Sequence, residues 1–127
     1  MIQTVRLLAA LLIGGVIGAA AVPSLQAQPS RRGAYVISET HVIDPAGFTE
    51  FVKAEPATLA PFHGRVLARA LPDVREGAAP DGTVAILGFD SLEDANRWYN
   101  APDTIKLMEQ RRTSAKSKVY ILDGQIQ

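Results

Sequence analysis

The sequence predicts an α+β domain with a four-stranded antiparallel sheet, because one pattern of elements occurs in it twice. Residues 34–70 have the pattern of a strand, a helix and a strand, and residues 84–124 repeat that order. The strand segments are rich in β-branched residues, and the helical segments begin at capping residues followed by apolar residues at helical spacing. Two strand-helix-strand halves of this size are typical of the ferredoxin-like βαββαβ arrangement.

The first half begins with a predicted strand over residues 35–43. Asp44 follows it and can cap a helix, and Pro45 suits the first helical position because proline has no N–H to leave unbonded there. Gly64 ends the helical pattern, since glycine is the usual residue just after a helix. Residues 65–70 are then expected to form the second strand.

The predicted helix of the first half places Phe48, Phe51 and Leu59 at helical spacing, on a face that belongs in the core. Pro56 lies inside this segment and removes one internal hydrogen bond. We therefore expect the helix to kink or break near Glu55.

The second half follows a long connection at residues 71–82, which contains two prolines and two glycines. Residues 83–89 are apolar almost throughout, which indicates a strand covered on both faces. The remaining predicted elements are a helix opened by the capping box Ser91–Asp94 and ending near Asn100, a helix restarted by Pro102, and a strand over residues 116–123.

The first 27 residues have the pattern of a secretory signal peptide. Arg6 precedes an apolar run over residues 7–22, which is too short to span a bilayer comfortably. A basic start, an apolar middle and a small-residue end predict cleavage after Ala27. Retention of the segment as a membrane anchor is the alternative, because Leu25 is large for the third residue before a cut.

Cleavage at that point divides the rest of the chain into a flexible lead-in, residues 28–33, and a folded domain, residues 34–124. It predicts a periplasmic or secreted protein with no membrane attachment. The mature chain would carry 12 basic and 13 acidic residues, because Arg6 is the only charged residue removed. Such a neutral chain does not favour nucleic acid as a partner. The sequence contains no cysteine, which excludes disulfides, thiolate catalysis and cysteine-bound metal clusters.

Short motifs occur in a characteristic order along residues 35–124. They are Tyr35-Val-Ile-Ser-Glu39, Asp44-Pro45, Ala57-Thr-Leu-Ala60, Gly64-Arg65, Arg69, Phe89-Asp-Ser-Leu-Glu93, Ala95, Trp98-Tyr99, Pro102 and Arg111. Their order and spacing resemble the family named domain of unknown function 1330, within the dimeric α/β-barrel superfamily. The chain departs from the common pattern at His63, where the family has glycine, and at Thr104, where it has an aromatic residue.

The resemblance implies a homodimer whose two sheets face each other, with a cleft between sheet and helices in each subunit. The residues independently favour a dimer, because the third strand has two apolar faces and the helices can cover only one. The resemblance implies no activity. More distant members of the superfamily are similar to cofactor-independent monooxygenases, lactone isomerases and haem-degrading enzymes, so a small organic molecule is the expected ligand.

Five side chains are the candidates for a ligand site. His63 is the candidate general acid or base, because the charge of histidine changes nearest neutral pH. Arg69 and Arg111 are expected to hold an anionic group of the ligand through guanidinium hydrogen bonds. Trp98 and Tyr99 are expected to form apolar walls. No metal and no other cofactor is expected.

The same residues also allow a purely structural interpretation. Arg65 and Arg69 stand four apart in a strand and should therefore share one face. An inward arginine either faces a pocket or forms an ion pair, and Glu39, Asp90 and Glu109 are the available acids. Two functions stay open: a cofactor-independent enzyme acting on a small molecule, and a non-catalytic dimeric binding or structural module.

Overall fold

The computed structural model describes residues 32–124, so the predicted signal peptide and most of the predicted lead-in lie outside the described residues. The elements are β1 (Ala34–Val42), α1 (Pro45–Leu59), the short 3-10 helix η1 (Ala60–Phe62), β2 (Arg65–Ala70), β3 (Thr83–Phe89), α2 (Leu92–Tyr99), α3 (Pro102–Arg112) and β4 (Ala115–Asp123). The four strands form one antiparallel sheet in the order β2-β3-β1-β4. This confirms the predicted ferredoxin-like α+β fold.

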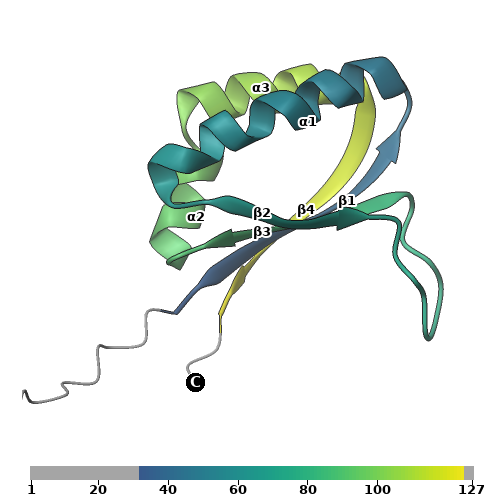
Figure 1. Ribbon diagram of the computed structural model, residues 1–127, viewed down its shortest axis with the longest axis horizontal. Helices are drawn as coiled ribbons and strands as arrows, with labels where there is room; N and C mark the ends of the chain where they lie inside the picture. The colour runs from purple at the N-terminus through teal and green to yellow at the C-terminus, as the bar shows by residue number, and fades with distance from the viewer. Residues whose placement is uncertain (1–31, 125–127) are drawn as a thin grey trace, which may run out of the picture.

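The core lies between one face of the sheet and the helices. α1 and α3 lie side by side over that face, and α2 packs against the sheet below them (Figure 1). Phe51 and Leu59 of α1 meet Leu87 and Phe89 of β3, and all four are buried. Alternation along each strand sends every second side chain to this face, so the sequence pattern accounts for the core.

The helix α1 is continuous from Pro45 to Leu59, so of the kink or break expected near Glu55, the break is wrong. Pro56 is exposed, so its ring points away from the sheet, while Phe51, Glu55 and Leu59 are buried on the opposite side of the helix. Burial of apolar side chains on both sides of the proline offsets the one hydrogen bond that it removes.

β2 contains a bulge that the sequence did not indicate. Leu67 is an extra residue between the paired positions of β2 and β3. The bulge puts Arg65 in register with Gly88, on the sheet face away from the helices, and Arg69 in register with Ala85, on the helix face. The expectation that the two arginines share a face is therefore wrong.

The sheet face away from the helices, called the outer face here, carries apolar side chains in register across the strands. Ile37 is aligned with Ile86 on one side and Tyr120 on the other, and Tyr35 is aligned with Leu122. The largest exposed apolar side chains of this face are Tyr35, Leu67, Tyr120 and Leu122. No element in residues 32–124 covers them.

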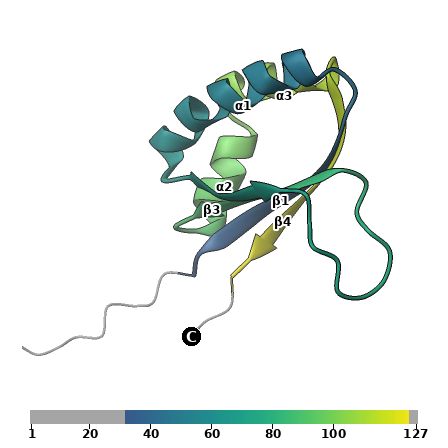
Figure 2. The ribbon, with the colours of Figure 1, turned by 45° about the vertical axis from the view of Figure 1, so that its right-hand side comes forward.

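The connection of residues 71–82 extends away from the helical layer, on the outer-face side of the sheet (Figure 2). It contains no strand or helix, so β2 ends at Ala70. Within the described part of the chain, no helix has the length and apolar character needed to cross a membrane.

Candidate functional site

A cluster of charged side chains is buried under the helices. Glu55 comes from α1, Arg69 from β2 and Arg111 from the last turn of α3. Arg69 Nη2 donates to Glu55 Oε1 at 2.5 Å. The guanidinium carbons of Arg69 and Arg111 lie 5.9 Å and 5.6 Å from the centre of the Phe51 ring, within the range of cation–π attraction. The structure thus brings together the two arginines that the sequence analysis selected.

The cluster holds two guanidinium groups and one carboxylate. Glu55 is 3% exposed and Arg111 is 7% exposed. Within residues 32–124, no acidic side chain forms a salt bridge with Arg111, and its Nε has no hydrogen-bond partner. Nε and Nη1 of Arg69 are also buried without a partner. Buried polar groups are normally paired, so these three guanidinium nitrogens leave the positive charge of the cluster incompletely compensated within the described chain.

Burial shifts the proton equilibria of this cluster. Burial raises the pKa of Glu55 above its ordinary value of 4.5, and the charge of Arg69 opposes that shift. Burial also lowers the pKa of Arg111, while Tyr99 and Glu55 act in the opposite direction. Both shifts show that the surroundings disfavour the charged forms, so an added counter-charge beside Arg111 would be stabilising.

Arg111 forms the buried side of a hollow of about 420 Å³, called the β4 hollow here. It opens where the ends of α2 and α3 meet the edge strand β4. The cations Arg111, Arg112 and Lys116 line it, and none of its lining residues is acidic. The full lining consists of Tyr99, Arg111, Arg112, Ala115, Lys116, Ser117 and Val119. The hollow therefore combines positive charge with the apolar surfaces of a tyrosine and a valine.

Of the two predicted aromatic walls, only Tyr99 lines the β4 hollow. Trp98 is 1% exposed and packs on Phe89 with the ring centres 5.4 Å apart. Its Nε1 donates to Thr58 Oγ1 at 3.0 Å, which satisfies the indole N–H inside the core. Trp98 therefore lies in the core and touches the site only through its ring contact with Tyr99.

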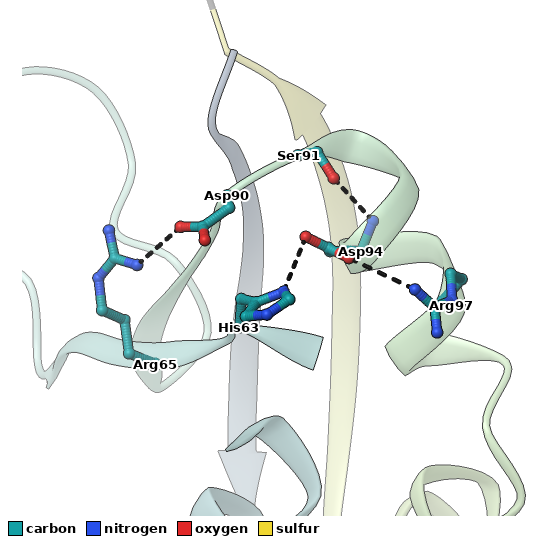
Figure 3. Close-up of polar contacts among 6 residues, drawn as sticks. All are labelled: His63, Arg65, Asp90, Ser91, Asp94 and Arg97. Carbon is teal, nitrogen blue, oxygen red and sulfur yellow. Dashed lines mark hydrogen bonds and ion pairs between the residues drawn. The ribbon is translucent and has the colours of Figure 1, made fainter. Parts of the chain in front are cut away.

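His63 lies in a different place, at the surface between η1 and β2. Its Nδ1 is 3.3 Å from Asp94 Oδ2 at the start of α2, and its side chain is 63% exposed (Figure 3). Asp94 also faces Arg97, and Arg65 pairs with Asp90 nearby. His63, Asp90 and Asp94 line a second hollow of about 530 Å³.

His63 and Arg69 are separated along the sheet. His63 precedes the first residue of β2, and Arg69 is near the end of that strand, so their backbones are roughly 15–20 Å apart at the usual rise per strand residue. The structure does not bring the predicted acid or base to the arginines. The other histidine of the chain, His41, lies near the 71–82 connection, with its Nδ1 3.1 Å from Asp81 Oδ1. Residues 32–124 contain no group of three histidine, cysteine or acidic side chains placed to hold a metal.

Glu55 belongs to the site although it was not among the residues predicted for it. A signal for its burial was present, because Glu55 stands four residues after Phe51 and four before Leu59 and so shares their helix face. An acid at the centre of an apolar helix face is expected to have a buried cation as partner. The sequence did not identify Arg69 as that partner.

Solved structures of the same fold include proteins of known and unknown function. RPA0582, a protein of unknown function from Rhodopseudomonas palustris, has a TM-score of 0.59 at 11% identity, covering 80% of this chain and 88% of that chain. SnoaB, a cofactor-independent oxygenase from Streptomyces nogalater, has a TM-score of 0.56 at 16% identity, covering 76% and 96%. A dimeric ferredoxin-like protein of unknown function from Thermobifida fusca YX has a TM-score of 0.53 at 11% identity, covering 72% and 91%.

At these identities the similarity establishes the fold alone. No curated protein matches the chain. Residues 33–125 match the family model described as Domain of unknown function (DUF1330), which covers most of the chain. The protein therefore belongs to the DUF1330 family, as the resemblance of its motifs implied.

Proposed function

We propose that the domain binds a small organic molecule in the β4 hollow. The observation that carries this proposal is Arg111, a buried cation at the wall of the hollow whose Nε has no partner in the described chain. Small-molecule sites are typically hollows of a few hundred Å³, and the β4 hollow has that size, with a lining that three cations and a serine make mostly polar. Tyr99 and Val119 supply the apolar surface here.

The proposal is a binding function without an assigned reaction. His63, the predicted general acid or base, lines the other hollow, so a reaction at Arg111 would have no histidine beside it. SnoaB, a protein of the same fold, is a cofactor-independent oxygenase. A shared fold does not transfer an activity, so non-catalytic binding is the function that the geometry supports best.

We also propose that the protein is a homodimer in which the outer faces of two sheets meet. The exposed aromatic and aliphatic side chains of that face form a patch that water disfavours, and a second copy would bury it. Tyr120 donates a hydrogen bond to Glu39 at 3.0 Å, which satisfies this polar pair before association. The dimeric state of the Thermobifida fusca protein of the same fold supports this assembly.

Thermal melting with a panel of small aromatic and aliphatic compounds, both neutral and charged, tests the proposed ligand site. We expect some compounds to raise the melting temperature of the wild-type protein, because a ligand that binds only the folded state stabilises it. Val119→Trp should abolish that rise by filling the hollow. Ile121→Trp is the matched control, because Ile121 is on the same strand and face and does not line the hollow. Equal protection of both variants would overturn the proposal.

A further inference from the structure

We propose that Glu55 and Arg69 set the charge that the β4 hollow accepts, and that its ligand is an organic acid with a single negative group placed against Arg111. This inference rests on the proposed function and adds the chemical class of the ligand. It also assigns a role to Glu55, an acid that lines neither of the two hollows described above.

The buried cluster has two positive charges and one negative charge, so one negative group on the ligand would balance it. The Oε1 atom of Glu55 accepts from Arg69 Nη2, so the single carboxylate of the cluster is engaged by Arg69. Arg111 faces the same Phe51 ring without an acid of its own in the described chain. One positive charge is left over at the buried wall of the hollow, and a buried charge is costly until it is paired. One anionic group of a ligand would complete the balance.

The geometry of arginine favours a carboxylate. A guanidinium group presents neighbouring N–H groups in a planar fork that matches the two oxygens of a carboxylate. Arg111 lies at the wall of the β4 hollow and would present such a fork to the ligand. Tyr99 and Val119 would contact the apolar body of the acid. Arg112 and Lys116 are exposed, so salt screens their charges. They would attract an anionic ligand to the hollow and contribute less to the choice between charged and neutral ligands.

Arg69 is a positioning residue in this account. It lines neither hollow, and its hydrogen bond goes to Glu55. Arg69 holds the carboxylate of Glu55 in place by its hydrogen bond. The negative charge of Glu55 then offsets the charge of Arg69, and the charge of Arg111 remains for the ligand. This replaces the expectation that Arg69 itself holds the anionic group of the ligand.

Isothermal titration with benzoate and benzamide tests the inference, because the two probes share a ring and differ in charge. We expect the wild-type protein to bind benzoate about tenfold more tightly than benzamide, the size typical of a hydrogen bond to a charged group. Arg111→Gln should reduce that preference to less than about twofold. Arg75→Gln removes the same charge from an exposed position in the 71–82 connection and should leave the preference unchanged.

Glu55→Gln tests the charge balance itself. Glutamine keeps an oxygen that can accept from Arg69 and removes the negative charge, so benzoate should bind about threefold to tenfold more tightly while benzamide affinity stays constant. A weaker benzoate affinity in a folded Glu55→Gln variant would overturn the role of Glu55. If melting curves show that this variant does not fold, the comparison of Arg111→Gln with Arg75→Gln decides the question.

The two proposals fail in different ways. Equal affinity of the wild-type protein for benzoate and benzamide would overturn the ligand class, and the small-molecule site would stand. A panel in which no compound protects the wild-type protein, or in which Val119→Trp has no effect, would overturn the site itself.

Discussion

Glu55 Oε1 lies 2.5 Å from Arg69 Nη2, and this contact joins the middle of α1 to the edge strand β2 across the core. Both side chains are largely buried, with 4% of the Glu55 side chain and 16% of the Arg69 side chain exposed. The edge strand is therefore tied to the helical layer partly by an ion pair. The same pair fixes the position of the one negative charge beside Arg111.

Replacement of Arg69 should destabilise the fold, and the loss should depend on whether the new side chain still carries a positive charge beside Glu55. Arg69→Leu leaves an uncompensated buried carboxylate and should cost about 3–5 kcal/mol in the free energy of unfolding. Arg69→Lys keeps the charge and loses the planar fork, so it should cost about 1–3 kcal/mol. Urea denaturation of the three proteins measures both values.

The double variant Glu55→Leu/Arg69→Leu is the control for that series. It removes both charges together, so it should recover much of the stability lost in Arg69→Leu. A loss below about 1 kcal/mol in Arg69→Leu, the size expected of an exposed pair, would show that the contact is not desolvated in solution.

The stability of the protein should depend on pH through Glu55. Because burial raises the pKa of Glu55 above 4.5 in the folded state, the folded protein keeps this proton to a higher pH than the unfolded chain does. The contribution of Glu55 to the free energy of unfolding is therefore most favourable below its unfolded pKa. It falls as the pH rises through the interval up to the raised pKa.

Comparison with Glu55→Gln isolates that contribution. The unfolding free energy of Glu55→Gln minus that of the wild-type protein should increase with pH through the interval and become constant above it. Denaturant midpoints at a series of pH values, starting below 4.5, measure the difference. A difference that decreases with pH would show that Arg69 outweighs burial and lowers the pKa of Glu55.

Local patterns predicted the order and type of the elements because caps and periodicity act within a few residues. Asp44 accepts from Ala46 N, and Ser91 accepts from Asp94 N, as the sequence indicated. The predicted strands agree with the observed ones to within a residue or so. The break predicted at Pro56 was wrong because α1 buries side chains both before and after the proline. That burial outweighs the helix-breaking tendency of proline.

The candidate site was predictable only in part, because it depends on contacts between distant segments. The extra residue Leu67 separates Arg65 from Arg69, and such a bulge follows from the pairing with β3 rather than from the composition of β2. Trp98 was expected to form a wall of the site, and it lies instead in the core, where its indole N–H donates to Thr58. The separation of His63 from Arg69 follows from the length of β2.

The proposed dimer should dissociate when a charge is placed on the outer face. Ile86 is in register with Ile37 on that face, so Ile86→Arg would bury an unpaired cation in the interface. Sedimentation equilibrium should give twice the mass of one chain for the wild-type protein and the mass of one chain for the variant. Ile105→Arg, on the exposed side of α3, should remain a dimer. A wild-type protein that is monomeric at micromolar concentration would contradict the assembly.

Export is a further proposal, and it concerns residues outside those that the structure describes. Cleavage after Ala27 would make Gln28 the first residue of the mature protein. N-terminal sequencing of the protein recovered from outside the cytoplasm should begin at Gln28, and Leu11→Arg should reduce that recovery by placing a charge in the apolar run. A sequence beginning at Met1 would favour the membrane-anchor alternative.

The central claim, that a ligand occupies the β4 hollow beside Arg111, is tested most directly by mapping where benzoate binds. Titration of the isotope-labelled protein, followed by amide chemical shifts, should perturb residues around the hollow, including Arg111, Arg112, Ser117 and Val119. The amides of His63 and Asp94, at the other hollow, should stay unchanged. Perturbations confined to His63 and Asp94, with none around Arg111, would contradict the account.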